Sequence, residues 1–323
     1  MRLLQNTLTL IFLLSIGFVK AQISDYRLAL TPMSIEELPG MQSYSYGQYD
    51  GEWLIVGGRI DGLHKRRPFE AFTPDGNNSK MYVVNIEDGK VWSSDLSTLS
   101  VPLQEQLAST NHNFCQHNDQ LIITGGYGYS PTAGDHVTYN QLTSIDIEKT
   151  IAAIKNNASL SNSITQISDT LFDVTGGRLE VIDDTFYLVG GHQFEGRYNP
   201  MGPDHGPGFF QEYSNQIRKF TLENSPLTFK HVASFTDPEL HRRDFNVVPQ
   251  ILPDQTMGLT AFSGVFQIDE DLPFLNSVDI SSKGYTVNNN FTQYYNHYHC
   301  ASMPLEASYL NQMPPTLLCR RLD

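Results

Sequence analysis

The stretch EWLIVGG at Glu52–Gly58 is repeated along the chain. Related stretches are QLIITGG at Gln120–Gly126, TFYLVGG at Thr185–Gly191 and MGLTAFSG at Met257–Gly264. Each is a short run of apolar, β-branched or aromatic residues that ends at small residues, which is typical of a buried strand. Because the copies recur about 70 residues apart, the sequence predicts a repeat architecture.

The residues around each copy predict a unit of four antiparallel strands, in which the glycine-ended stretch is the second strand. In the first unit, the alternating pattern of Ser43–Tyr49 predicts the first strand. An Asp-Gly turn follows, and Trp53–Gly58 is the second strand. A long loop leads to the third strand, Lys80–Ile86, and a turn leads to the fourth, Lys90–Leu96. Three more units follow the same order, with strands expected at Asn111–Gln116, Gln120–Gly126, Leu142–Ile147 and Ile164–Ser168, at Gly177–Ile182, Phe186–Gly191, Gln216–Leu222 and Phe229–Phe235, and at Phe245–Leu252, Met257–Ser263, Leu275–Ile280 and Tyr285–Asn290. A short helix is expected at Glu148–Ala153.

A fifth unit begins near the end of the sequence. Residues 296–300 match residues 111–115 as NHxxC, and Ser308–Met313 starts a strand that should end in glycines. Pro314-Pro315 interrupts this strand, because consecutive prolines cannot donate to a sheet ladder. We therefore expect a C-terminally truncated repeat protein with a non-repeat tail at 314–323.

The chain has three cysteines, Cys115, Cys300 and Cys319, so at least one is unpaired. Cys115 and Cys300 occupy equivalent points of the second and fifth units, which are not adjacent. A disulfide requires Cα atoms within about 7 Å. We therefore expect no bond between these two cysteines.

The paired glycines that close the second strand, an aromatic residue on the fourth strand (Trp92, Phe229) and the turns between the first two strands resemble kelch-type β-propellers. The resemblance covers roughly Ser43 to Met313. It implies an all-β fold of four-stranded antiparallel blades stacked around an axis, with four recognisable blades and a partial fifth. Residues 22–313 are assigned to this incomplete propeller, and Arg27–Leu30 would be the strand that closes the ring. An unrelated antiparallel sandwich is the alternative.

Residues 1–21 have the pattern of a secretory signal peptide. Arg2 precedes an apolar run from Leu8 to Val19, and Val19-Lys20-Ala21 suits a cleavage site. The run is shorter than the about 20 residues of a membrane span. The sequence therefore predicts export, to the cell surface, the periplasm or the medium.

The charge balance is acidic, with 21 Lys and Arg against 35 Asp and Glu and a formal net charge of −14. Proteins that bind nucleic acids or anionic membranes present clustered Lys and Arg instead. The composition therefore argues against both as partners.

Topology selects the face of the fold on which a ligand is expected. In an antiparallel meander, the connection after the second strand and the connection into the first strand lie on the same side of a sheet. The long connections Arg59–Ser79, Tyr127–Thr138 and His192–Ser214 therefore share one face. Long loops on a rigid scaffold commonly carry binding sites.

The candidate ligand-binding residues lie in these three loops. They are His64, Arg66, Tyr129, His192, Arg197, Tyr198, His205 and Phe209. The basic run that contains His64 and Arg66 is either a solvated charge run or an anion site, whereas aromatic rings beside polar groups suit sugars or peptides. No catalytic residue, metal ligand or cofactor is assigned. His241-Arg242-Arg243-Asp244 is expected to make contacts between units.

These observations favour an exported binding module for a protein or glycan ligand. The alternatives are a sugar-active enzyme of the kelch-propeller group, an oxidase or a mutarotase, or an inactive truncated remnant. Neither the cysteine–tyrosine copper site of the galactose oxidase group nor any common hydrolase or phosphate-binding motif is matched residue by residue.

Overall fold

The computed structural model describes residues 29–295 and 298–302. Residues 29–35 contain no regular secondary structure and belong to the smaller of the two units of the chain. The signal peptide, the tail at 314–323 and Ser308–Met313 lie outside the described residues. The fold that follows is that of the larger unit, which begins at Glu36.

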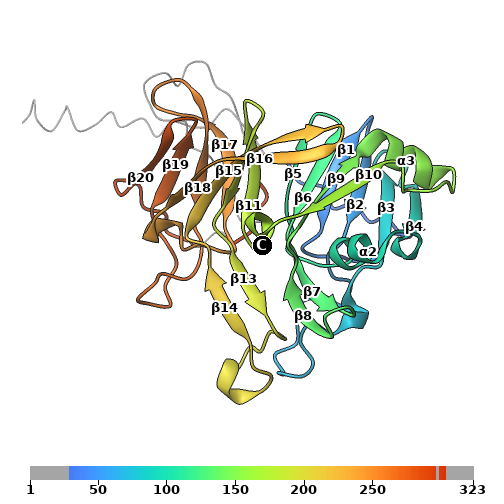
Figure 1. Cartoon of the computed structure of the whole chain (residues 1–323), viewed down its shortest axis with the longest axis horizontal. Coiled ribbons are helices and arrows are strands. Elements are labelled where there is room, and N and C mark those ends of the chain that lie inside the picture. Colours follow the sequence, from blue (N-terminus) through green and yellow to red (C-terminus); the bar gives the residue numbers. More distant parts are fainter. Residues whose placement is uncertain (1–28, 296–297, 303–323) are drawn as a thin grey trace, which may run out of the picture. The chain divides into compact units, whose positions relative to one another are not determined.

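The larger unit is all-β and contains four antiparallel sheets of four strands each (Figure 1). We name them sheets I to IV in chain order. Their strands are β1 (Ser45–Tyr49), β2 (Glu52–Val56), β3 (Lys80–Asn85) and β4 (Val91–Asp95) in sheet I, β5 (Asn113–His117), β6 (Gln120–Thr124), β9 (Gln141–Asp146) and β10 (Ile164–Ser168) in sheet II, β11 (Arg178–Ile182), β12 (Thr185–Val189), β15 (Gln216–Asn224) and β16 (Leu227–Thr236) in sheet III, and β17 (Asn246–Ile251), β18 (Met257–Phe262), β19 (Ser277–Ser281) and β20 (Gly284–Asn288) in sheet IV. The predicted four-strand order is thus confirmed in all four sheets.

Two of the three long connections are not the loops that the sequence suggested. After β6, the chain forms a hairpin of β7 (Tyr127–Ser130) and β8 (Asp135–Thr138), and after β12 it forms a second hairpin of β13 (His192–Glu195) and β14 (Phe210–Tyr213). The glycines and prolines of these segments concealed short alternating runs such as YGYS. A strand of four residues gives too little periodicity to be recognised in isolation.

Two short helices of the described chain lie in connections between strands, α2 (Val101–Leu107) between sheets I and II and α3 (Ile147–Lys155) between β9 and β10 of sheet II. The short helix expected at Glu148–Ala153 is confirmed as α3. Its N-cap is Asp146, whose side chain accepts a hydrogen bond from the Lys149 amide. The helix α2 was missed. Short 3₁₀ turns are η2 (Pro74–Gly76), η3 (Leu96–Thr98), η4 (Thr170–Phe172), η5 (Pro203–His205) and η6 (Pro238–Leu240). Among the described residues, no helix is long and apolar enough to cross a membrane.

Neighbouring sheets pack face to face. One core joins residues of sheets I and II, including Leu54 and Leu121, a second joins sheets II and III, and a third joins sheets III and IV. The first strands contact one another in sequence, β1 with β5, β5 with β11 and β11 with β17. Burying the apolar faces between sheets supplies the main driving force for this stacking.

The repeated glycines are required by the backbone at the end of each second strand. Gly57 and Gly58 have φ of +69° and +86°, and the equivalent pairs in sheets II and III also lie in the left-handed region. In sheet IV, Ser263 has a φ of +68° and precedes Gly264. This explains why the motif recurs, since glycine adopts such angles at the lowest cost.

A chain of backbone hydrogen bonds links the four sheets just before their first strands. The Asn111 amide donates to the Ser43 carbonyl, the Gly176 amide to Asn111, and the Asp244 amide to Gly176, at 3.2, 3.2 and 3.4 Å. All four residues have positive φ. The same turn is therefore repeated at each junction between sheets.

His112 is the central side chain of the junction between sheets I and II. Its Nδ1 accepts from Ser45 Oγ at 3.1 Å, and its Nε2 donates to the Gln106 carbonyl at 2.8 Å. Burial lowers the pKa of His112 to about 4, against the opposing effect of the hydrogen bond to Gln106. The folded protein therefore holds a neutral imidazole there at neutral pH.

His112 makes stability depend on pH, and a His112→Gln variant isolates this effect. An unfolded histidine titrates near pH 6.5, so between pH 6.5 and 4 the unfolded chain binds the extra proton. Stability from His112 is complete above pH 6.5 and is lost as the pH falls toward 4. Between pH 7 and 5 the wild type should lose about 2 kcal/mol more unfolding free energy than the variant.

Urea unfolding of both proteins at pH 7 and pH 5 measures this difference. Other buried groups and the packing cost of the substitution cancel, because only the change with pH is compared. An equal loss in both proteins would contradict the neutral, buried state of His112.

Two expectations about the chain ends find no support in the described residues. Ala29 and Leu30 form no strand, and the rest of the proposed closing strand lies outside the described residues. The fifth unit falls largely on residues outside the description, and the described residues 298–302 form no strand. Cys115 and Cys300 are free, as expected.

Candidate functional site

The three long connections emerge on the same side of the sheets, as the topology predicts. In sheets I to III, the residue that follows the glycine pair forms a bridge with a residue three positions before the first strand of the same sheet. These bridges are Arg59 with Gln42, Tyr127 with Thr110 and His192 with Thr175. Hairpins β7–β8 and β13–β14 project together from the sheets, and β8 contacts β13 (Figure 1).

Arg59 holds the first connection, 59–79, in place. Its guanidinium is buried and donates to both carboxylate oxygens of Asp61, to Asn77 Oδ1 and to the Thr73 carbonyl. It also lies over the Phe72 ring, 5.0 Å from the centroid. A loop with little regular structure is thereby ordered around one buried cation.

The two hairpins are joined by hydrogen bonds. Thr138 Oγ1 donates to the Phe194 carbonyl at 2.9 Å and accepts from the Phe194 amide at 2.7 Å. The Gly196 amide donates to the His136 carbonyl at 2.9 Å. The β7–β8 and β13–β14 hairpins therefore form one continuous support.

An aromatic loop cluster forms where the three connections meet. We define it by its seven rings, His64, Phe72, Tyr127, His136, Phe194, Tyr198 and Phe209. Ring centroids of neighbours lie 4.8 to 6.5 Å apart, for example 4.9 Å between His64 and Tyr198 and 4.8 Å between Phe194 and Phe209. Such pairs stabilise beyond the area that they bury.

The cluster has a buried base and a half-exposed surface. Tyr127, His136 and Phe194 are buried, whereas His64, Phe72, Tyr198 and Phe209 are half-buried. This arrangement leaves ring surface open to solvent on a rigid support. Aromatic rings held in this way can stack on a sugar or pack against an apolar side chain.

Polar atoms in the buried base are satisfied across the loops. The Tyr127 hydroxyl donates to the Gly196 carbonyl at 2.7 Å and accepts from the Tyr198 amide at 2.9 Å. His136 Nε2 donates to the Phe72 carbonyl at 2.7 Å. Burial raises the pKa of Tyr127 and lowers the pKa of His136, so both groups are neutral at pH 7. These bonds fix the relative positions of the three loops.

The structure brings most of the sequence-predicted residues to this cluster. His64, Tyr198 and Phe209 are members. Tyr129 contacts the His136 ring, His192 contacts the Phe194 ring, and Arg197 Nη1 donates to the Phe69 carbonyl at 3.1 Å.

Arg66 and His205 are exposed on the same connections and lie outside the cluster. Sequence reasoning missed the four rings at its centre, Phe72, Tyr127, His136 and Phe194. The only available signal was the alternation of aromatic residues in the two unrecognised hairpins.

His192 is buried and not available to a ligand. Gln211 Nε2 donates to its Nδ1 at 2.5 Å, and the ring packs beside Tyr213. Burial lowers the pKa of His192 to about 3, and the nearby charge of Arg243 adds to this effect. The side chain is therefore neutral and supports the β13–β14 hairpin.

A second polar group lies where sheets III and IV meet. Arg178 Nη2 donates to His299 Nδ1 at 2.7 Å, and His299 Nε2 donates to Asp244 Oδ1 at 2.9 Å. Burial would raise the pKa of Asp244, but the His299 hydrogen bond and the Arg243 charge together lower it to about 2. His299 thus links the end of the described chain to both sheets.

Glu180 follows Arg178 on the same face of β11. Burial raises the pKa of the Glu180 carboxyl to about 7, although the charge of Arg178 opposes this shift. Among the described residues, no group of three or more His, Cys, Asp or Glu side chains could hold a metal ion.

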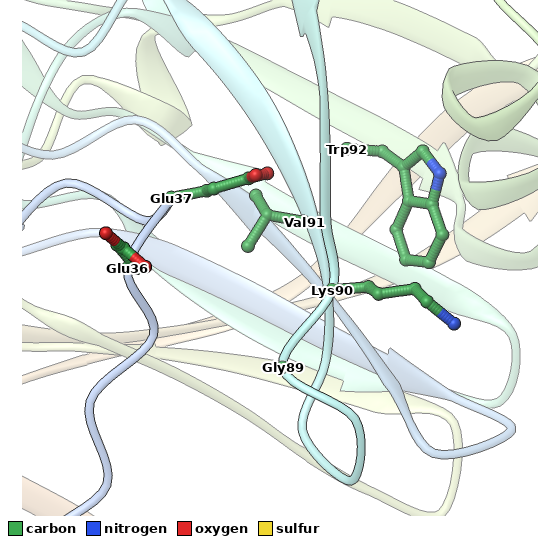
Figure 2. Close-up of a pocket in the computed structure, with 6 residues that line it drawn as sticks. All are labelled: Glu36, Glu37, Gly89, Lys90, Val91 and Trp92. Atoms are coloured by element: carbon green, nitrogen blue, oxygen red, sulfur yellow. The ribbon is translucent and has the colours of Figure 1, made fainter.

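Two pockets of the larger unit, one beside β4 and one beside η4 and β16, are lined by residues outside the aromatic loop cluster. The first, of ≈ 290 Å³, is open and lies between Glu36-Glu37 and the edge strand β4. Val91 points toward Glu37, whereas Lys90 and Trp92 point to the other side of the strand (Figure 2). Its polar groups do not converge on one point, so it is a weak candidate for a small-molecule site.

Comparison with models of known protein families and with curated protein sequences finds no match.

Proposed function

We propose that this chain is an exported kelch-type β-propeller module that binds a protein or glycan ligand at the aromatic loop cluster. The observation that carries the proposal is the convergence of three connections, from three different sheets, on one half-exposed aromatic surface. Buried hydrogen bonds hold this surface before any ligand arrives, which reduces the ordering cost of binding.

The propeller assignment rests on features that the four sheets share. Each is a four-stranded meander, each second strand ends in left-handed residues, and each first strand contacts the next first strand. Blades that stack in this way put the connections after their second strands on one face. Export rests on the pattern of residues 1–21.

A double variant, His64→Ala with Tyr198→Ala, tests the binding surface. Both rings are half-buried, so their removal should take away ligand contact and leave the fold intact. We expect at least a tenfold loss of affinity for whatever ligand the wild type retains, since one tenfold step corresponds to about 1.4 kcal/mol. Wild type and variant are compared on one glycan array and one peptide array.

The matched control removes a histidine and a tyrosine elsewhere, with His231→Ala and Tyr294→Ala, both exposed residues outside the cluster. The control variant should still bind the ligands that the wild type binds. Equal losses in both double variants, or unchanged binding in the first, would overturn the proposal.

A further inference from the structure

Large apolar side chains are exposed beside the aromatic loop cluster. Leu63 and Phe69 in connection 59–79 are 85% and 69% exposed, and Met201 and Phe210 in connection 192–214 are 58% and 54% exposed. We call these four residues the apolar loop patch. Single exposed apolar residues are ordinary, but a group of them on adjoining segments marks an interaction surface.

The two connections that carry the patch are held together. Arg197 Nη1 donates to the Phe69 carbonyl at 3.1 Å. A Cβ added to Gly206 would lie only 2.6 Å from Pro68 Cβ, so the two connections are in direct contact. The His64 and Tyr198 rings meet at 4.9 Å. The apolar loop patch is therefore built from two segments in a fixed relation.

A basic run lies within the patch. Lys65, Arg66 and Arg67 separate Leu63 from Phe69, and all three are exposed. Lys65 and Arg67 share one carboxylate, Glu70, at 3.4 and 3.1 Å. Within residues 65–70, three positive charges face one negative charge, so this run is locally positive, although the two connections 59–79 and 192–214 together hold five basic and six acidic residues.

We propose that the apolar loop patch and the adjoining basic run dock a peptide segment of a partner protein that carries large apolar and acidic side chains. This inference rests on the proposed function and specifies its ligand. The exposed apolar side chains supply contact area, and the basic run selects an acidic segment through charge complementarity. An anionic membrane is disfavoured as the occupant, because the strong negative charge of the whole chain would be repelled.

Synthetic fluorescein-labelled peptides test the inference with the full chain. The probe alternates Glu with Phe and Leu; a second peptide has Lys for each Glu, and a third has Ser for each Phe and Leu. We expect the first peptide to bind with a dissociation constant on the order of 10–100 µM and each of the others at least tenfold more weakly. Raising the salt concentration should weaken the first complex.

Two variants separate the two contributions. Leu63→Ser with Phe69→Ser should lower affinity for the acidic peptide at least tenfold. Lys65→Glu with Arg66→Glu should lower it similarly, and added salt should no longer weaken the complex. The matched control, Ile268→Ser with Leu272→Ser, changes two exposed apolar residues of another loop and should leave binding unchanged.

Three results would overturn the inference. They are equal binding of the acidic and basic peptides, no binding of the acidic peptide, and co-sedimentation with phosphatidylglycerol vesicles that Leu63→Ser with Phe69→Ser abolishes. If binding of a glycan depends on His64 and Tyr198 while the acidic peptide does not bind, the inference fails and the proposed function stands.

Discussion

Replacing Gly125 with alanine is expected to prevent stable folding. A Cβ at this position would lie 1.8 Å from the Val174 carbonyl oxygen, which belongs to the segment leading into sheet III. The nearest atoms all belong to backbone, so no flexible side chain can move to relieve the clash. Gly125 also has a φ of +64°, which costs an alanine roughly 1–2 kcal/mol by itself. We expect a total loss of more than about 4 kcal/mol of unfolding free energy.

Gly51→Ala is the matched control for this prediction. Gly51 has a similar φ of +77°, but nothing lies within 4 Å of an added Cβ. Its substitution should cost only about 1–2 kcal/mol, the conformational part of the effect. Urea unfolding and the yield of soluble protein measure both variants. Similar stability of the two would show that sheets II and III do not approach as closely as described.

Replacing Arg242 with alanine is the second change with a large expected effect. Arg242 is 1% exposed, and its guanidinium donates to the Ser263 and Asn276 carbonyls and to Asn276 Oδ1. It also lies over the Phe274 ring, 4.2 Å from the centroid. Removing it takes these donors away from the buried Ser263 and the half-buried Asn276 and leaves a cavity, so we expect a loss of about 3–5 kcal/mol.

Two further variants make the Arg242 prediction specific. Arg242→Lys retains the charge but cannot reproduce the planar fork of donors, so it should recover less than half of the loss. Arg66→Ala removes an exposed arginine and should leave the unfolding midpoint in urea unchanged. Full stability of Arg242→Lys would mean that charge, and not the donor geometry, holds sheet IV.

Arg242 also confirms the structural interpretation of the run His241–Asp244. The Gly191 amide donates to the Arg242 carbonyl at 2.7 Å, which joins sheet III to the start of sheet IV. Charged residues grouped in sequence can suggest a ligand site. Here their position just before a first strand indicates a contact between units, and the structure shows that contact.

The candidate site was predictable in its location but not in its composition. The meander order and the lengths of the connections are enough to put 59–79, 127–138 and 192–214 on one face. Which rings meet there depends on hairpins β7–β8 and β13–β14, whose four-residue strands give little periodicity. His192 shows the same limit. Its polarity suggested a residue that contacts a ligand, but its ring is buried, is hydrogen-bonded to Gln211 and supports the β13–β14 hairpin.

The sequence by itself determined the four-strand units and the second strand of each, because apolar runs and obligatory glycines leave a local signature. Only the tertiary structure decided what the glycine-ended stretch Glu52–Gly58 is for. A Cβ on Gly57 would lie 2.5 Å from the His112 ring of the next sheet, so the motif records a close approach between sheets as well as a turn. Such contacts join residues far apart in the chain, and no local pattern encodes which side chain will occupy the other side.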